Sequence, residues 1–265
     1  MLFQGVLRKM TTVFDQPIQY YWRLGSDTLH ANQLLGKRLD MHFIGHQCLN
    51  CGNDRPIFRQ GFCRSCFFES PAAGDWIMRP ELSTAHLDKE DRDLEYEKRV
   101  QLQPHVVYLA HSSHVKVGVT RKSQVPTRWI DQGAHQAMEI LEVPNRYLAG
   151  VAEVALKEHV SDKTSWQKML TQTGETSDLK GLYEELLPSF PEEVQQYAKP
   201  AAESWNLRFP VNKTPEKVKS LNIEKEENYQ GRLVGIKGQY LLFEDERVFN
   251  VRSNEGTVIG LNIYN

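Results

Sequence analysis

The sequence predicts an α+β protein with a small metal-binding module between two β-rich ends. Three features of the 265-residue chain lead to this expectation. Strand-like runs occur near both termini, strands and helices alternate in the middle, and all four cysteines lie between residues 48 and 66. Short strands at both ends, with the cysteines between them, indicate that the ends pair into one small, barrel-like β module.

Composition and charge narrow the class of protein. A hydrophobic content of 40% with 25% charged residues is typical of a globular chain, and no apolar run is long enough to span a membrane. The N-terminal MLFQGVLRKM lacks the apolar stretch of a secretory signal, so we expect a cytoplasmic protein. The net charge of −2 is unevenly spread: residues 99–168 carry nine basic and six acidic residues, whereas residues 171–200 carry six acids and two lysines. A basic cleft and an acidic docking segment are both compatible with this pattern.

Residues 1–47 form the expected N-terminal β segment. The runs GVLRKM, PIQYYWRL and KRLDMHFIGH have strand character, with turns at residues 25–27 and 36–37 between them. The last of these runs leads directly into the first cysteine.

The cysteines lie in CLNCGNDRPIFRQGFCRSC, two Cys-x2-Cys pairs separated by eleven residues. Each pair can grip one metal from a tight turn, and two pairs complete a closed tetrahedral zinc site. Gly52 suits a turn that needs positive φ, and residues 57–59 would form a short strand. Two disulfides or free buried thiols are the alternatives, but disulfides need an oxidising compartment. We therefore expect a structural zinc ribbon over residues 48–70, with the ligands Cys48, Cys51, Cys63 and Cys66.

A connecting segment over residues 71–104 precedes the central part of the chain. Its LDKEDRDLEYEKRVQLQ has helical character and dense charge, which is typical of a solvated helix. Pro104 is expected to end this helix before the next strand begins at His105.

Residues 105–200 alternate between strands and helices. The strands HVVYLA and VKVGV are followed by the helix PTRWIDQGA, the strand MEILEVP and the amphipathic helix NRYLAGVAEVALKEHV. An acidic helical segment over 171–200, interrupted by prolines, completes this part and is a candidate docking site for a protein partner. Residues 201–228 are loop-rich and would form a linker, and residues 229–265 return to β structure.

This order of elements resembles the GIY-YIG nuclease superfamily. Val107-Tyr108-Leu109 stands where the first motif places its tyrosine, and Lys116-Val117-Gly118 stands for the second motif. The resemblance implies a small mixed sheet with flanking helices, a catalytic arginine at Arg128, and Mg²⁺ or Mn²⁺ at Glu153. Lys116 replaces the second tyrosine of the superfamily, and Ser165 falls near the position of its asparagine.

The chemistry of phosphodiester hydrolysis explains why these residue types would be used. Tyr108 could act as a base if Lys116 lowers the pKa of its phenol, Arg128 would contact the phosphate, and Glu153 would hold the metal. Each residue also has a structural interpretation. Tyr108 can belong to the core, Lys116 can face outward from a strand, Arg128 can form a salt bridge, and Glu153 can face solvent.

Three further residues are candidates for nucleic-acid contacts. Arg121 and Lys122 follow the second strand and could bind backbone phosphates. Trp129 could stack on a base, although a tryptophan at the start of an amphipathic helix is more often part of the core.

Longer phrases resemble a bacterial family called domain of unknown function 2797, which is grouped with the GIY-YIG nucleases. They are PHVVYLA, KVGVTRKSQVPTRWIDQGA and GIKGQYLLF, together with the cysteine pairs. The family name implies no activity. We favour a zinc-containing nucleic-acid-binding protein, DNA or RNA, with catalysis in doubt because of Lys116 and Ser165. A metal-dependent endonuclease and a protein-interaction module are the alternatives.

Overall fold

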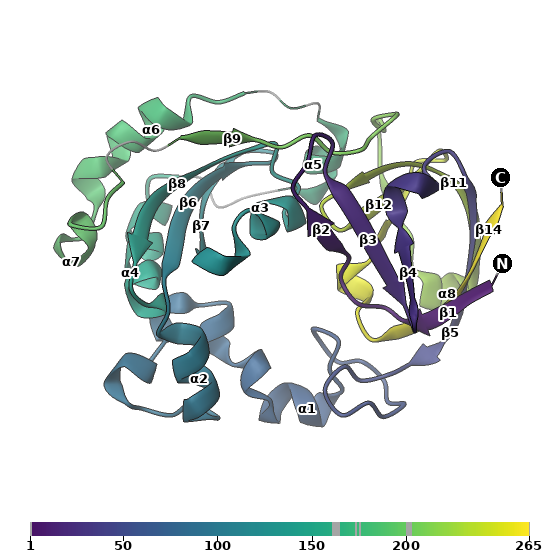
Figure 1. Ribbon diagram of the computed structural model, residues 1–265, viewed down its shortest axis with the longest axis horizontal. Coiled ribbons are helices and arrows are strands. Elements are labelled where there is room, and N and C mark those ends of the chain that lie inside the picture. The colour runs from purple at the N-terminus through teal and green to yellow at the C-terminus, as the bar shows by residue number, and fades with distance from the viewer. Residues whose placement is uncertain (1, 161–164, 173, 175, 200–202, 265) are drawn as a thin grey trace.

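The computed structural model describes residues 2–160, 165–172, 174, 176–199 and 203–264. It confirms the α+β class, with three sheets and helices around them. One of the sheets has four strands. Figure 1 shows a β-rich body that carries both termini, a second body that contains this four-stranded sheet, and a chain of short helices beneath them. We call the first body the β module and the four-stranded sheet the core sheet.

The two ends of the chain form one sheet, as the sequence predicted. The N-terminal strand pairs antiparallel with the C-terminal strand, with Leu2 opposite Asn262 and Val6 opposite Val258. The sheet runs in the order β1 (Leu2–Val6), β14 (Thr257–Tyr264), β5 (Arg38–His46), β11 (Asn228–Lys237), β12 (Tyr240–Phe243), β13 (Arg247–Asn250) and β10 (Lys219–Ser220).

A smaller sheet packs beside the seven-stranded one. Its central strand alternates between buried and more exposed residues, and Tyr20, Trp22 and Leu24 point into the core of the β module. The strands are β2 (Thr11–Val13), β3 (Gln19–Leu24) and β4 (Asp27–His30), followed by the short 3-10 helix η1 (Ala31–Leu34).

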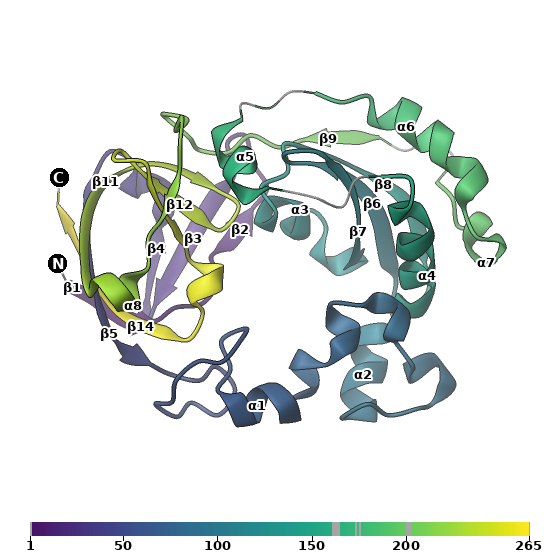
Figure 2. The same ribbon diagram turned by 180° about the vertical axis from the view of Figure 1, so that it is seen from behind.

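The cysteine segment and the connecting segment arch under both bodies (Figure 2). β5 runs directly into Cys48, and α1 (Arg64–Glu69) begins after Cys63. The strand expected at residues 57–59 is reduced to a single bridge between Arg59 and Phe62, because the chain reverses between them. The connecting segment contains η2 (Pro71–Ala73), η3 (Asp75–Ile77), η4 (Pro80–Leu82), η5 (Ala85–Leu87) and the expected helix α2 (Leu94–Gln101).

The core sheet has helices on both faces. Its order is β7 (Val115–Arg121), β6 (His105–His111), β8 (Gln136–Val143) and β9 (Ser204–Asn206). The side chains of β6 alternate between two cores: Tyr108 packs toward α3 (Thr127–Asp131), whereas Val107 and Leu109 pack toward α4 (Arg146–Lys157). Because both faces are covered, β6 is buried along almost its whole length.

The core on the α3 face is continuous with the core of the β module. Trp129 of α3 packs edge-on against Trp205 of β9 and belongs to the same cluster as Leu7 and Leu261. The two bodies therefore share an apolar joint and hold α3 between them, as Figure 1 shows.

The remaining helices lie at the edges of this arrangement. Residues 201–228, which were expected to be a loop-rich linker, contribute β9 to the core sheet and β10 to the β module. The acidic segment packs its apolar side chains Leu179, Tyr183 and Leu186 with the α4 side of the core. The elements are α5 (Trp166–Thr171), α6 (Leu179–Leu186), η7 (Leu187–Ser189), α7 (Glu192–Gln195) and α8 (Ile223–Glu226). Within the described residues, no helix combines the length and apolar content needed to cross a bilayer.

Candidate functional site

The four cysteines come together as a possible metal site. Their sulfur atoms all lie within 4.8 Å of one another, and only Cys51 is exposed. A tetrahedral site with Zn–S bonds of about 2.3 Å needs sulfurs about 3.8 Å apart, so small movements close the site around one ion. The fold supports the two turns: Gly52 has φ of +72°, and the backbone N–H of Cys63 donates to Sγ of Cys48 at 3.3 Å.

The surroundings of the sulfurs favour a bound cation. Burial opposes ionisation of Cys48, but the backbone N–H groups of Cys51 and Cys63 outweigh it and lower the pKa of this thiol to about 6. For Cys66, Asn50 favours the thiolate, whereas burial and the three other sulfurs together raise the pKa to about 12. Four thiolates without a cation would repel one another, and a metal ion supplies the missing positive charge.

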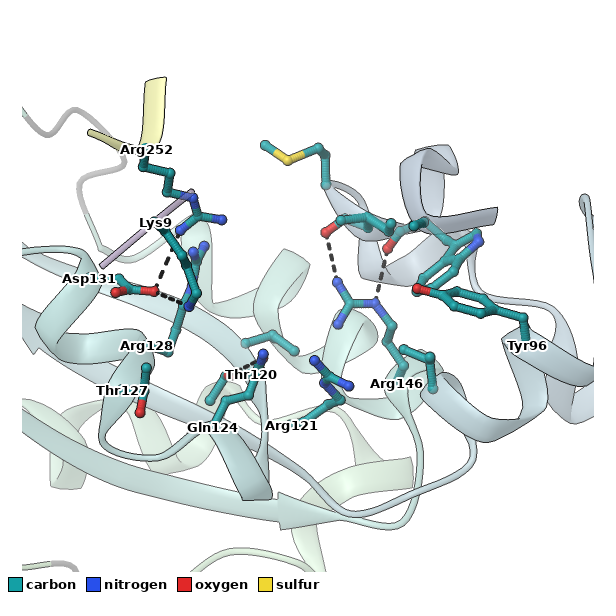
Figure 3. Close-up of a pocket in the computed structure, with 16 residues that line it drawn as sticks. Lys9, Tyr96, Thr120, Arg121, Gln124, Thr127, Arg128, Asp131, Arg146 and Arg252 are labelled. Atoms are coloured by element: carbon teal, nitrogen blue, oxygen red, sulfur yellow. Dashed lines mark hydrogen bonds and ion pairs between the residues drawn. The ribbon is translucent and has the colours of Figure 1, made fainter. Parts of the chain in front are cut away.

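A second site is a strongly cationic pocket where the two bodies and the connecting segment meet. Its cavity has a volume of about 280 Å³. Figure 3 shows Lys9, Arg128 and Arg252 gathered around Asp131 on one side, and Arg121 and Arg146 facing the pocket on the other. We call it the arginine pocket, and its five cationic residues are Lys9, Arg121, Arg128, Arg146 and Arg252.

Asp131 is the carboxylate in the lining of this pocket, and it ties the two bodies together. Its side chain is only 3% exposed and accepts from Nζ of Lys9 at 2.8 Å. It also accepts from Nε2 of Gln239 at 2.8 Å, and Arg252 lies 3.8 Å away. Gln239 in turn bonds both backbone groups of Met10. The carboxylate of Asp131 is thus already paired with groups at the joint.

Arg146 combines a structural role with its place in the pocket. Nε donates to the carbonyl of Trp76 at 3.0 Å and one terminal nitrogen donates to the carbonyl of Ile77 at 2.8 Å. These bonds hold the connecting segment against α4. Burial lowers the pKa of this guanidinium to about 10; Glu153 opposes the shift, and the positive charges of Arg121 and Arg128 add to it.

Arg121 and Arg128 have donors left for a ligand. The side chain of Arg121 makes no hydrogen bond or ion pair with any residue that the structure describes. Arg128 lies beside the Tyr108 hydroxyl, and both arginines are half-buried at the pocket wall. Two of the sequence-predicted residues are therefore brought together in a cationic pocket.

Tyr108 is fully buried and packs against the opposite strand. Gly118 lies directly across from it, and a Cβ at Gly118 would come within 2.6 Å of the phenol ring. Burial raises the pKa of Tyr108, although Arg128 and Gln132 lie close enough to favour its ionised form. The hydroxyl forms no hydrogen bond of normal geometry within the described part of the chain.

The other two residues of the predicted catalytic set do not line the arginine pocket, although Glu153 lies close enough to Tyr108 and Arg146 for its charge to act on the pKa of both. Lys116 lines a neighbouring cavity and does not line the arginine pocket. Glu153 is buried on α4, where its carboxylate pairs with Lys157 at 3.4 Å. Burial raises the pKa of Glu153, while the charges of Lys157 and Arg146 oppose the shift. The structural interpretation had placed Glu153 on a solvent-facing surface of its helix, but the side chain is buried. The predicted Mg²⁺ or Mn²⁺ at Glu153 stays a prediction.

The structure places the two other candidates for nucleic-acid contacts outside the arginine pocket. Trp129 is fully buried in the joint, where its ring packs edge-on against Trp205, so its faces are not exposed to a base in this structure. Lys122 lies outside the arginine pocket and pairs with Glu142 at 2.6 Å, although its neighbour Arg121 lines that pocket.

Sequence reasoning missed three of the five cations. Lys9 and Arg252 come from opposite ends of the chain and meet only because β1 pairs with β14. Arg146 could have been found from the sequence, because it lies on the buried face of an amphipathic helix together with Ala149 and Ala152. An arginine in an apolar stripe needs polar partners, and that requirement points to a site.

Comparisons with known proteins identify the family and nothing beyond it. No curated protein and no solved structure matches the chain. The model of one family, described as a protein of unknown function (DUF2797), matches residues 36–259. This match covers most of the sequence, including the four cysteines and all the cations of the arginine pocket except Lys9. The chain belongs to the DUF2797 family.

Proposed function

We propose that this protein binds nucleic acid through the arginine pocket and does not cleave it. The observation that carries the proposal is the charge of the pocket, which has five cationic side chains and one carboxylate, Asp131, that is already paired. A concave site of this composition attracts phosphate groups, and guanidinium groups match two phosphate oxygens at once.

The electrostatics of the pocket support an anionic ligand. Arg121, Arg128 and Arg146 lie near enough that their charges disfavour one another, and the pKa of Arg146 is lowered accordingly after the larger effect of burial. A phosphate between them would relieve this repulsion. Because nucleic acid presents phosphates at regular intervals, it can also reach the exposed cations at the rim.

Binding without cleavage is favoured by the state of the presumed catalytic groups. A general base must be able to lose its proton, yet Tyr108 is buried with a raised pKa. A metal-binding carboxylate must be accessible to the ion, yet Glu153 is buried and pairs with Lys157, and burial raises its pKa. We regard the scaffold as GIY-YIG-like because Tyr108 lies opposite Gly118 and Arg128 lies beside it.

We further propose that the metal of the four cysteines is structural zinc. All four ligands come from the protein, so no position is left open for catalysis. The ribbon borders a cavity of about 770 Å³ that also contacts Arg252, next to the arginine pocket. The zinc would therefore fix one wall of the surface that nucleic acid approaches.

The test compares two neighbouring cations that the structure separates. Arg121→Ala should weaken binding of labelled single-stranded and duplex DNA and RNA by roughly tenfold at low salt, because it removes a phosphate contact. Lys122→Ala is the matched control, because it removes the same charge one residue away but outside the pocket. We expect this variant to change the affinity by roughly twofold at most.

The same titration, repeated with Mg²⁺ or Mn²⁺, decides between binding and cutting. Intact nucleic acid after incubation supports binding alone. Metal-dependent products that disappear in Glu153→Ala would establish the endonuclease alternative. If the protein does not bind any of the labelled nucleic acids at low salt, the proposal is overturned and a protein partner at the acidic segment 171–200 is favoured.

A further inference from the structure

A second cavity adjoins the arginine pocket. It has a volume of about 240 Å³ and shares two of its lining residues, Asp131 and Arg252, with that pocket. We call it the aromatic pocket, and the residues that give it its character are Lys116, Gln132, Trp166, Tyr240 and Asn250. The two cavities therefore lie side by side, with Asp131 and Arg252 in the wall that both share.

One wall of the aromatic pocket is a pair of parallel rings. Trp166 of α5 and Tyr240 of β12 stack with centroids 5.8 Å apart and planes inclined by 7°. Both side chains are half-buried, so part of their apolar surface borders the cavity. Flat, partly exposed aromatic surface beside a cationic groove is the arrangement on which unpaired bases stack.

The polar lining includes an acceptor without a donor. Oε1 of Gln132 is buried and has no hydrogen-bond partner within the described residues. A buried acceptor of this kind is unfavourable without a donor, and an N–H group of a ligand can supply one. Every nucleobase carries such a group on its pairing edge.

We propose that the aromatic pocket receives one unpaired nucleobase of the nucleic acid whose phosphate lies in the arginine pocket. This inference rests on the proposed function and narrows its substrate to single-stranded or extrahelical nucleotides. A base inside a duplex has both faces covered and its pairing edge occupied, so it cannot use the rings or Gln132. The site selects for an unstacked base through the shape of the cavity and through its orphaned acceptor.

The experiment measures binding of a single strand that contains 2-aminopurine, beside the same strand in a duplex. The wild-type chain should bind the single strand more tightly, with a change in 2-aminopurine fluorescence as the base enters the pocket. Trp166→Leu should weaken single-strand binding by roughly tenfold and leave duplex binding unchanged, because it removes one stacking contact. Trp166→Phe keeps an aromatic surface and should retain most of the affinity, which separates loss of stacking from loss of fold.

A matched control removes a stacked ring outside both pockets. Tyr147 stacks on His86 with centroids 4.4 Å apart, so Tyr147→Leu should leave the affinity for the single strand unchanged. Equal binding of single strand and duplex, or equal behaviour of Trp166→Leu and Tyr147→Leu, would overturn the base site. If Arg121→Ala still weakened binding in that case, the proposed function would stand; if no nucleic acid bound at all, both would fail.

Discussion

His105 opens strand β6 with its ring fully buried beside the arginine pocket. Nδ1 donates to the carbonyl of Gln103 at 2.7 Å, whereas Nε2 is buried without a hydrogen-bond partner in the described chain. Burial lowers the pKa of His105 to about 4; the Gln103 carbonyl opposes this shift, and the charges of Arg146 and Arg121 increase it. The ring is therefore neutral at pH 7.

This histidine makes stability depend on pH in a defined window. The unfolded chain binds a proton near pH 6.5 and the folded chain only near pH 4, so the free energy of unfolding should fall as pH drops through this interval. The loss attributable to His105 reaches about 3 kcal/mol and then levels off. Denaturant titrations at several pH values should show a flatter profile for His105→Gln than for His159→Gln, an exposed control. Identical profiles would contradict the assignment.

Neighbouring residues show what the sequence could not resolve at this level. The sequence predicted Arg121 and Lys122 equally as phosphate ligands. In the structure, β7 ends at Arg121 and the chain continues into η6 (Lys122–Gln124). One cation lines the pocket and the other reaches Glu142 of β8. Such a difference depends on where a strand ends, which a period-two pattern leaves uncertain by a residue or two.

Among the secondary-structure elements, those with a strong pattern were predicted well. β6, β7, β8 and α4 follow from apolar periodicity. α2 begins at Leu94, after its N-cap Asp93, whose side chain accepts from the backbone N–H of Tyr96. β9 and β10 were missed because they span three and two residues, which is too short to show a period. α3 was predicted as a helix, but its burial between two sheets depends on tertiary structure.

The cysteine ribbon is the element whose stability should depend most on a ligand. Few apolar side chains support it; Ile57 and Phe62 are the partners that pack on the buried cysteines. We expect one zinc per chain. Because folding and metal binding are coupled, removal of the zinc by a chelator should unfold residues 48–70. We expect the same treatment to weaken nucleic-acid binding by roughly tenfold. Metal analysis of Cys63→Ser should show loss of zinc, whereas Ser65→Ala, an exposed control between the ligands, should retain it. A full complement of zinc in Cys63→Ser would exclude the four-cysteine site.

At the level of the whole molecule, the joint between the two bodies combines apolar packing with one buried charge. The core around Trp129 runs continuously from the core sheet into the β module. Asp131 lies at the edge of this core, and Lys9, Gln239 and Arg252 reach it from both ends of the chain. The same carboxylate also lines the arginine pocket, so the joint and the pocket are built from shared residues.

Asp131→Asn should lower the stability of the protein without weakening its binding of nucleic acid. Removing this charge weakens the hydrogen bond from Lys9 and leaves the partly exposed Arg252 without its partner, and we expect the free energy of unfolding to fall by about 2 kcal/mol. Nucleic-acid affinity should be unchanged or higher, because the pocket becomes more positive. Denaturant unfolding measures the first effect, with the exposed Asp27→Asn as control. A cost equal to that of the control would show that Asp131 does not secure the joint.

The arginine pocket itself shows the limit of sequence reasoning. Its cations span residues 9 to 252, and only Arg121 and Arg128 were recognised, through a local pattern. The other three converge through strand pairing between the termini and through the packing of α4 on the connecting segment. Long-range pairing of this kind is not encoded in any short window of the chain.

The salt dependence of nucleic-acid binding tests the central claim most directly. A plot of log affinity against log salt concentration should be steep for the wild-type chain, because phosphate contacts release counterions. Arg121→Ala should make the slope shallower by about 0.7 for a single strand, and Lys122→Ala should leave it unchanged. Equal slopes for the two variants, or an affinity that salt does not alter, would contradict binding of phosphate in the arginine pocket.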